Sequence, residues 1–332
     1  MKPFYECSEL GRARRLRGLV EQALQHYDLE VTKIRLLSND YNGVFRVDTT
    51  EGTPYAMRVC IPQEGLESTL ALETAWLHAL RDKAPFAVPA PVPTREGSFF
   101  TQVESSSVPE PRYCALFEWV KGKDLVVDFS EDNAVRYGAL AAHLHELGAT
   151  FPKPEGLDIR AYDTVGPFSE PWVLDEPEKR SIMPEELRDF IPVAVKHVSQ
   201  HIERLLSSSQ QMQVIHGDLH SYNVKAYRNK LAPIDFEDLM WGYPAQDLGI
   251  IFYYMWRREE YPMLRESFER GYRSVREWPE ETPGEVDAFI AGRSLVLLNV
   301  LLQQKTQEIR DYLPGFMERM VEQLNALLPD KA

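Results

Sequence analysis

The strongest constraint on the fold is a change in hydrophobic periodicity in the first half of the chain. Residues 31–59 alternate between apolar and polar and are broken by two clusters of turn residues, which predicts three strands. Apolar spacing typical of amphipathic helices comes before and after them, at 9–28 and 67–83. Two more strands are expected at 98–102 and 113–119. The start of the chain therefore predicts a small sheet with few helices.

The rest of the sequence is mostly helical. Helices are predicted at about 134–148, 185–207, 245–274, 284–305 and 313–328, with two short β-type runs within 211–236. Strands first and helices afterwards indicate a segregated α+β fold, because alternating βαβ units would mix the two patterns. A chain of 332 residues is also long for one core. We expect two lobes, an N-lobe over 1–119 and a helical C-lobe over 120–330.

Charge and cysteine content exclude several classes of protein. Lys and Arg number 37 against 51 Asp and Glu, a formal net charge of −14, whereas nucleic-acid binding depends on clustered positive charge. The three cysteines are widely spaced and form neither a disulfide framework nor a metal-binding pattern. No apolar run approaches the roughly 20 residues of a membrane span, and the first residues lack the apolar core of a signal peptide. We expect a cytoplasmic protein that binds neither nucleic acid nor membranes; its oligomeric state stays open.

The chemistry is concentrated in Val214–Asp238. His216-Gly217-Asp218 is followed five positions after Asp218 by Asn223, and 17 positions after Asp218 by Asp235. Phosphoryl transfer from ATP needs a carboxylate near the acceptor hydroxyl and hard oxygen ligands that hold Mg²⁺ on the phosphates. Asp218 as the base, with Asn223 and Asp235 as metal ligands, would meet both needs.

This segment resembles the catalytic loop of the aminoglycoside phosphotransferase/choline kinase superfamily, which reads H-G-D-x-H-x-x-N. The continuation Ile234–Asp238 and the later Pro244–Gly249 also match that superfamily, and the branch containing homoserine-kinase-type and stress-response-kinase-type enzymes is the most similar. The resemblance covers roughly residues 31–305. It implies a protein-kinase-like fold with two lobes and the use of ATP and Mg²⁺.

The residues around this loop are expected to support it. His216 and His220 are interpreted as packed, hydrogen-bonded residues that shape the turn, since no third soft ligand suggests a metal site. Asp238 is either near the metal and substrate or structural. Asp247 is expected to accept hydrogen bonds from the loop backbone from the start of a helix, with substrate contact as the alternative.

The nucleotide-binding residues are expected in the first lobe. Where kinases of this type usually have a strand lysine, the sequence has Arg58, whose guanidinium also suits phosphate oxygens. Glu73 is the expected ion-pair partner of Arg58, with Glu67 as the competing choice. A surface position on a half-buried strand is the alternative interpretation of Arg58.

Two further segments complete the expected nucleotide site. The loop from Ser38 through Asn42 to Gly43 would cover the phosphates with backbone and side-chain donors, although an ordinary hairpin turn would look similar. The segment around Glu118 and Val120 would pair with the adenine edge, Glu118 through its carbonyl and Val120 through its N–H.

The function expected from the sequence is transfer of the γ-phosphoryl group of ATP to a hydroxyl of a small molecule, such as an amino alcohol, a sugar or an aminoglycoside. A protein Ser/Thr kinase of the stress-response type and a nucleotide-binding module with little catalysis are the alternatives. The sequence does not identify the acceptor, the physiological role, or whether Arg58 fully replaces the usual lysine.

Overall fold

The computed structural model describes residues 2–39, 41–168 and 170–328, which form two compact units. The first unit comprises the chain up to Lys123 together with Pro154–Asp158 and Ala232–Glu237. The second comprises Asp124–Lys153, Ile159–Leu231 and the chain from Asp238 onward.

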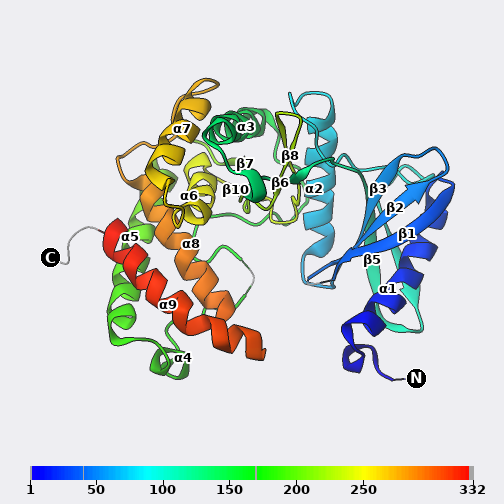
Figure 1. Ribbon diagram of the computed structural model, residues 1–332, viewed down its shortest axis with the longest axis horizontal. Helices are drawn as coiled ribbons and strands as arrows, with labels where there is room; N and C mark the ends of the chain where they lie inside the picture. Colours follow the sequence, from blue (N-terminus) through cyan, green and yellow to red (C-terminus); the bar gives the residue numbers. More distant parts are fainter. Residues whose placement is uncertain (1, 40, 169, 329–332) are drawn as a thin grey trace. The chain divides into compact units, whose positions relative to one another are not determined.

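The first unit is built on a five-stranded antiparallel sheet (Figure 1). Its strands, in spatial order, are β1 (Val31–Ser38), β2 (Gly43–Thr49), β3 (Pro54–Val59), β5 (Val108–Glu118) and β4 (Phe100–Ser105). Helix α1 (Glu9–Ala23) precedes the sheet and helix α2 (Leu66–Arg81) connects β3 to β4. Short 3-10 turns lie at Phe4–Glu6 and Leu24–His26.

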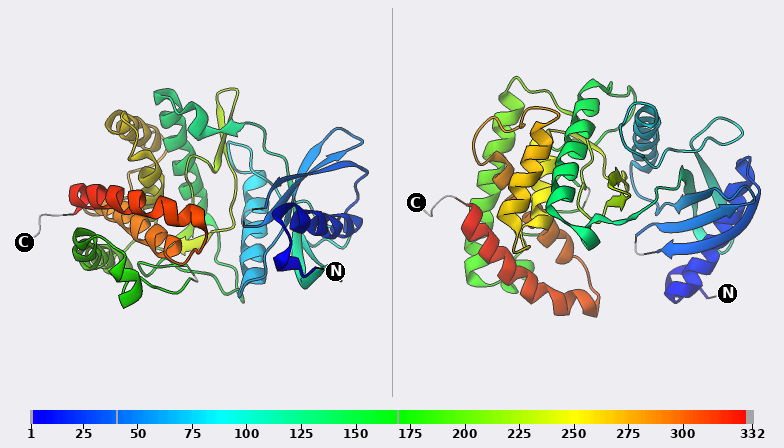
Figure 2. Two further views of the ribbon diagram at one scale, coloured as in Figure 1. Left: turned by 60° about the horizontal axis from the view of Figure 1, so that its bottom comes forward. Right: turned by 45° about the horizontal axis from the view of Figure 1, so that its top comes forward.

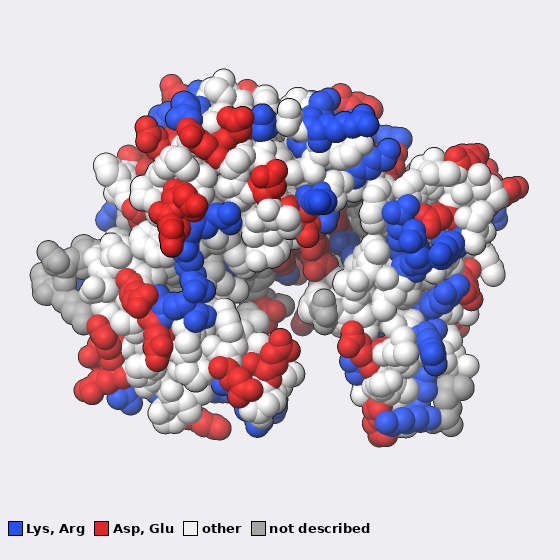
Figure 3. Space-filling model, in the orientation of Figure 1, with Lys and Arg blue, Asp and Glu red and all other residues white. Residues whose placement is uncertain are grey.

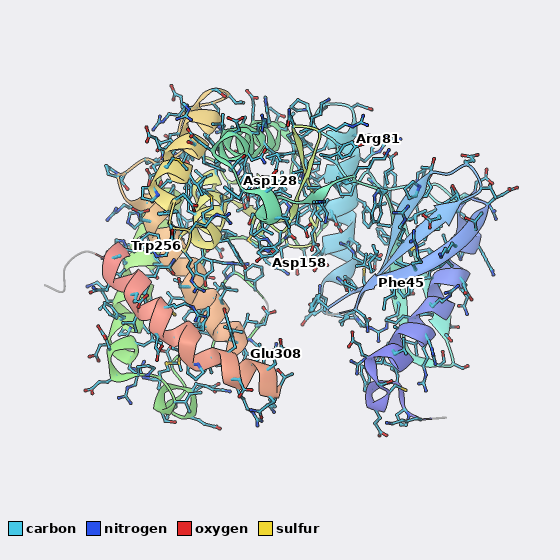
Figure 4. All side chains as sticks on the ribbon, in the orientation of Figure 1. Phe45, Arg81, Asp128, Asp158, Trp256 and Glu308 are labelled. Atoms are coloured by element: carbon cyan, nitrogen blue, oxygen red, sulfur yellow. The ribbon has the colours of Figure 1, made fainter. Side chains whose placement is uncertain are left out.

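The core of this unit lies between α1 and the sheet. Side chains of β2 alternate strictly between more and less buried positions, so that Phe45, labelled in Figure 4, and Val47 face inward. They join Leu19 and Val20 of α1 and Met57 of β3 in one apolar cluster, all at most 1% exposed. Apolar side chains repeat every two residues along the strand and every 3.6 residues along the helix, so each element has one apolar face. The two faces meet in a single core.

The second unit is mostly helical (Figure 1). Its helices are α3 (Glu131–Thr150), α4 (Pro177–Ser181), α5 (Glu185–Ser207), α6 (Pro244–Met255), α7 (Tyr261–Arg273), α8 (Glu285–Leu301) and α9 (Gln307–Leu327). A 3-10 turn at Leu125–Asp128 precedes α3. Helices α3 and α7 pack along each other, as do α6 and α8, and α8 and α9 lie side by side in both views of Figure 2.

Short strands hold the loops of the second half of the chain. Strand β7 (Gln213–Ile215) pairs with β10 (Met240–Gly242), and a second small sheet has the order β6 (Lys123–Asp124), β8 (Val224–Tyr227) and β9 (Lys230–Pro233). The catalytic-type segment found in the sequence lies between β7 and β8. Two short, anchored strands thus fix both ends of that loop.

The predicted segregated α+β class is confirmed, with an antiparallel sheet in the first unit and mostly helices in the second. The short elements α4, β6 and β10 were not predicted from the sequence, and α9 begins at Gln307 rather than at about 313. The single helical span expected at 245–274 consists of α6 and α7. The polar run Arg257–Glu260 separates them, and Pro262 in the first turn of α7 suits a helix start better than a helix interior. Within the described residues, no helix has the length and apolar character that a bilayer crossing requires. Acidic and basic side chains intermingle on the face of the helical unit that Figure 3 shows.

Candidate active site

The loop between β7 and β8 presents the Asp218 carboxylate, and both of its oxygens are engaged. Arg293 donates through Nη2 to Oδ1. Asn223 donates through Nδ2 to Oδ2 at 3.0 Å, and Nε2 of His220 lies 3.3 Å from the same oxygen. Three neighbours from α8 and from the loop itself therefore fix the orientation of this carboxylate.

The charge state of Asp218 follows from these contacts. Burial raises the pKa of Asp218, but the Arg293 guanidinium and the hydrogen bond from His220 outweigh burial and hold the pKa below its ordinary value. The side chain keeps 18% of its surface exposed. An ionised, oriented and partly accessible carboxylate is suited to accept a proton from a hydroxyl group.

Asp247 supports the loop from the first turn of α6, as predicted. Its Oδ1 accepts from the backbone N–H of Gly217 at 2.8 Å, and its Oδ2 accepts from the N–H of His216 at 2.9 Å. Nε2 of His145 lies 3.1 Å from Oδ2, and Asp247 is fully buried. Burial raises the pKa of Asp247, but the hydrogen bond from His145 and those of the loop outweigh it, so the pKa lies below its usual range.

Gly217 is required by the shape of the same loop. Its φ of +77° lies in the left-handed region that favours glycine. A Cβ at this position would also lie 2.1 Å from the backbone oxygen of Asp238. Tyr137 fixes the next turn, since its hydroxyl donates to the carbonyl of Leu219 at 2.5 Å. The backbone around Asp218 is thus determined from several sides.

His216, His220 and Asp238 are packed, paired residues. His216 is 3% exposed, and its Nδ1 accepts from the backbone N–H of Asp218 at 3.3 Å. The ring of His220 lies 4.4 Å from that of Tyr254. Asp238 accepts from Arg160 at 3.3 Å. The two histidines therefore shape the turn, as expected, and His220 additionally contacts the carboxylate of Asp218.

Asn223 of the second unit and Asp235 of the first each have a side-chain oxygen available for a cation. The amide nitrogen of Asn223 is used on Asp218, which leaves its Oδ1 without a hydrogen bond to any described residue. Asp235 is exposed and makes no hydrogen bond or ion pair within the described part of the chain. Its φ of +62° is uncommon for a residue other than glycine and is frequent at functional sites. Amide and carboxylate oxygens are hard donors that fit a divalent cation such as Mg²⁺.

Arg58 forms the predicted ion pair with Glu73 in the first unit. Its Nη1 donates to Oε1 at 3.0 Å and its Nη2 to Oε2, a bidentate arrangement between β3 and α2. Arg58 is 8% exposed and Glu73 is 2% exposed, so the alternative of a surface cation is wrong. Glu67, the competing partner, instead accepts from the hydroxyl of Tyr113 at 2.9 Å.

Asn42 and Glu237 extend this charged cluster. Nη1 of Arg58 lies 3.7 Å from Oε2 of Glu237, which also accepts from Nδ2 of Asn42. The Oδ1 of Asn42 accepts from the backbone N–H of Ile61 at 2.8 Å. Ser38 ends β1 opposite Val44. Asp40, within the loop expected to cover phosphates, lies outside the described residues.

The segment expected to pair with adenine follows β5. The backbone N–H of Glu118 donates to the carbonyl of Ala90 at 2.8 Å. The side chain of Glu118 accepts from Arg81 of α2, labelled in Figure 4, at 2.6 Å. Val120 is partly exposed two residues beyond the end of the strand. The roles of Glu118 and Val120 toward a nucleotide stay predictions.

Sequence reasoning missed Arg293 and His145. Arg293 is the single basic residue of the apolar helix α8, between Gly292 and Ser294. A lone arginine in such a helix indicates a buried side chain with an acidic partner, so the sequence contained a sign of its role. Its partner could not be known, because Asp218 is 75 positions away. His145 looked like any histidine on a helix, and only the fold brings it to Asp247.

Comparison with known proteins gave one family and many structures. The profile of the phosphotransferase enzyme family matches residues 33–283. No curated protein matched the chain. A microcompartment-associated aminopropanol kinase has a TM-score of 0.78 at 23% identity, covering 93% of this chain and 96% of that one. An amicoumacin kinase, solved with AMP-PNP, Ca²⁺ and Ami, has a TM-score of 0.71 at 15% identity, with 95% of each chain covered. A spectinomycin phosphotransferase, solved with ADP and spectinomycin, has a TM-score of 0.61 at 14% identity, covering 94% and 98%.

Proposed function

Because the chain belongs to the phosphotransferase enzyme family, we propose that it transfers the γ-phosphoryl group of ATP to a hydroxyl group of a small molecule, with Mg²⁺ as the metal. The observation that carries this proposal is the Asp218 carboxylate, ionised and oriented by Arg293, Asn223 and His220. The solved structures that share the fold are named for small acceptors, which supports the same substrate class.

Asp218 acts on the acceptor in this proposal. Its carboxylate accepts a hydrogen bond from the attacking hydroxyl, which aligns the oxygen with the phosphorus. Asp218 takes up the proton as the new P–O bond forms and the bond from the γ-phosphorus to the β–γ bridging oxygen of ATP breaks, so that ADP leaves with that oxygen. Asp247 acts through the loop, because its hydrogen bonds to His216 and Gly217 set the position of the Asp218 backbone. Most of the rate then comes from orientation and from fixed charges.

The nucleotide is assigned to residues of the N-lobe, 1–119, and the acceptor to the C-lobe, 120–330. Arg58, fixed by Glu73, supplies a cation for the phosphate oxygens, with Ser38 and Asn42 as further donors. Asn223 and Asp235 are the proposed Mg²⁺ ligands, and a bound Mg²⁺ would neutralise phosphate charge. No three His, Cys, Asp or Glu side chains gather as a metal cluster in the described ranges, so the proposed ligands are a mixed set of amide, carboxylate and phosphate oxygens.

Substitution of the proposed base tests this function. Asp218→Asn should lower turnover by at least about 10³-fold, because the amide cannot take up the proton, while ATP binding measured by calorimetry stays within a few-fold. Asp132→Asn, at an exposed position of α3, is the matched control and should keep the wild-type rate. The assay follows ADP release across amino alcohols, sugars, hydroxy acids, aminoglycosides and proteins. Unchanged turnover of Asp218→Asn would contradict the assignment.

A further inference from the structure

Arg293 has more hydrogen-bonding capacity than its protein partners use. Its Nη2 donates both to Oδ1 of Asp218 and to the hydroxyl of Tyr254, the latter at 3.1 Å. Its Nε is enclosed without a partner, and its Nη1 makes no hydrogen bond within the described residues. Two of the three guanidinium nitrogens therefore have no assigned acceptor, although the residue is only 7% exposed.

The surroundings of Arg293 indicate why guanidinium nitrogens without an acceptor are significant here. Its helix, α8, is almost entirely buried and apolar, so a cation there is costly unless it is paired. The carboxylates that act on Arg293 are Asp218 and, more weakly, Asp238. Asp238 is itself paired with Arg160 at 3.3 Å. The two acids are thus balanced by two arginines, and neither is left over to bind an ammonium group of an acceptor.

We propose that the acceptor carries a carboxylate, and that Arg293 binds it beside the hydroxyl that is phosphorylated. This inference rests on the proposed function and names the substrate class for it. A planar guanidinium with free nitrogens matches a carboxylate in charge and geometry, whereas it repels a cationic amine.

The position of Arg293 fixes the distance between the two groups of such an acceptor. One guanidinium nitrogen already touches Asp218, which is the proposed partner of the reacting hydroxyl. With N–H···O distances of about 2.9 Å, a carboxylate on the neighbouring nitrogen lies roughly 4–6 Å from that hydroxyl. Small hydroxy acids and hydroxy amino acids, with one to three carbons between the groups, satisfy this spacing.

The competing explanation is that Arg293 only positions Asp218 and does not touch the acceptor. It predicts a different effect of Arg293→Gln. Arg293→Gln would then slow every acceptor by the same factor, because the base is affected whichever molecule is bound. If Arg293 also binds a carboxylate, the loss is larger for carboxylated acceptors than for matched molecules that lack this group. The ratio of the two losses therefore separates the roles.

The first test uses pairs of acceptors that differ only in the carboxylate. Serine and ethanolamine, homoserine and 3-aminopropanol, threonine and 1-amino-2-propanol, and glycerate and ethylene glycol are compared by kcat/KM for ADP release at saturating ATP and Mg²⁺. We expect the carboxylated member of the best pair to be preferred by about 10-fold to 100-fold, the worth of a charged hydrogen-bonded contact. In Arg293→Gln this preference should fall to near one, and Arg293→Lys should restore part of it.

Turnover confined to the members without a carboxylate, or an equal loss for both members in Arg293→Gln, overturns the inference and leaves the proposed function intact. If the folded wild-type protein neither bound ATP nor turned over any acceptor, the proposed function itself would be wrong.

The second test measures binding without turnover. Asp218→Asn removes the counter-ion of Arg293, so it should bind the same hydroxy acids at least about tenfold more tightly than the wild type in calorimetric titrations. Adding Arg293→Gln to that variant should abolish the gain. Absence of carboxylate binding in both the wild type and Asp218→Asn would overturn the proposal even if no acceptor were turned over.

Discussion

At the scale of single residues, the charge of Asp218 sets a specific pH dependence. The pKa of Asp218 lies below its ordinary value of about 3.8 because Arg293 and His220 outweigh the effect of burial. Asp218 therefore stays ionised throughout the neutral and mildly acidic range, and its protonation limits the rate only below the ordinary carboxylate pKa. In Arg293→Gln the largest lowering influence is gone while burial remains, so the pKa rises and activity is lost at a higher pH.

The measurement is the ratio of wild-type to Arg293→Gln turnover from pH 4 to 8. Titration of the nucleotide affects both proteins equally and cancels in this ratio. The ratio of wild-type to Arg293→Gln turnover should rise as the pH falls. The ratio of wild-type to Arg293→Lys turnover should stay nearly constant, because lysine keeps the positive charge. A pH-independent ratio for Arg293→Gln would show that the guanidinium does not set the pKa of Asp218.

Asp247 should contribute strongly to stability. It is fully buried and accepts hydrogen bonds from His216 and Gly217, so Asp247→Asn places an amide donor against backbone donors. We expect a loss of about 3–5 kcal/mol in the free energy of unfolding, the usual cost of breaking a buried charged pair. Urea unfolding at pH 7 measures it, with Asp132→Asn as an exposed control that costs less than about 1 kcal/mol.

The pH dependence of this loss has a definite sign. Because the folded pKa of Asp247 is lower than the unfolded value, its stabilisation is fully present above the unfolded pKa and disappears as the pH falls through the folded one. The difference between wild type and Asp247→Asn should therefore shrink in acid. A difference that stays constant to pH 3 would argue that Asp247 is not ionised in the folded protein.

At the scale of elements, helices α3 and α7 are in contact through glycines. A Cβ on Gly138 of α3 would lie 1.9 Å from the carbonyl oxygen of Phe268, and one on Gly271 of α7 would lie 1.9 Å from that of Val135. Neither position allows a side chain unless the helices separate. Gly138→Ala should therefore destabilise the protein by about 3 kcal/mol or more, at the upper end of overpacking.

Gly315 of α9 is the matched control in the same unit. There an added Cβ meets only the mobile end of the Arg319 side chain, so Gly315→Ala should be neutral or stabilise the helix by up to about 1 kcal/mol. Both variants are compared by urea unfolding. Equal effects of the two substitutions would contradict the close helix contact.

Hydrophobic periodicity in the sequence predicted some of the helices and strands and not others. Periodicity was sufficient for the five strands of the sheet and for the helix α5, since each lies in one uninterrupted pattern. It could not separate α6 from α7, because both have apolar faces of similar spacing and only the turn at Trp256–Glu260 divides them. It also could not tell which polar residue of α8 meets the loop, because that depends on helix packing.

For the molecule as a whole, the contiguous part of the candidate site was predictable and the distant part was not. Asp218, Asn223 and Asp235 fall within one short segment, so their spacing alone suggested their chemistry. The ion pair of Arg58 with Glu73 was predictable for the same reason, since strand and helix follow each other directly. Arg293 reaches Asp218 through the packing of α8, and His145 reaches Asp247 through the packing of α3, and no local pattern encodes either contact.

Nucleotide and metal binding should be visible in the stability of the whole molecule. A ligand that binds only the folded state at 100 times its Kd stabilises it by about 2.7 kcal/mol. The entropy of unfolding is about 2.1 cal/mol/K per residue, so this stabilisation corresponds to a rise in Tm of roughly 4 °C for a chain of 332 residues. ATP with Mg²⁺ should give this shift, and ATP with excess EDTA a smaller one, because the proposed ligands Asn223 and Asp235 would then have no Mg²⁺ to bind.

Two variants separate the contributions to this shift. Asp235→Asn should keep the response to ATP alone but lose the additional response to Mg²⁺, since it removes an exposed carboxylate with no partner in the described chain. Arg58→Gln should lower the response to ATP with or without Mg²⁺, and its own stability should be measured first, because it leaves Glu73 buried without its counter-ion. If Asp235→Asn responded to Mg²⁺ as the wild type does, the proposed metal ligand would be wrong while Asp218 could still be the base.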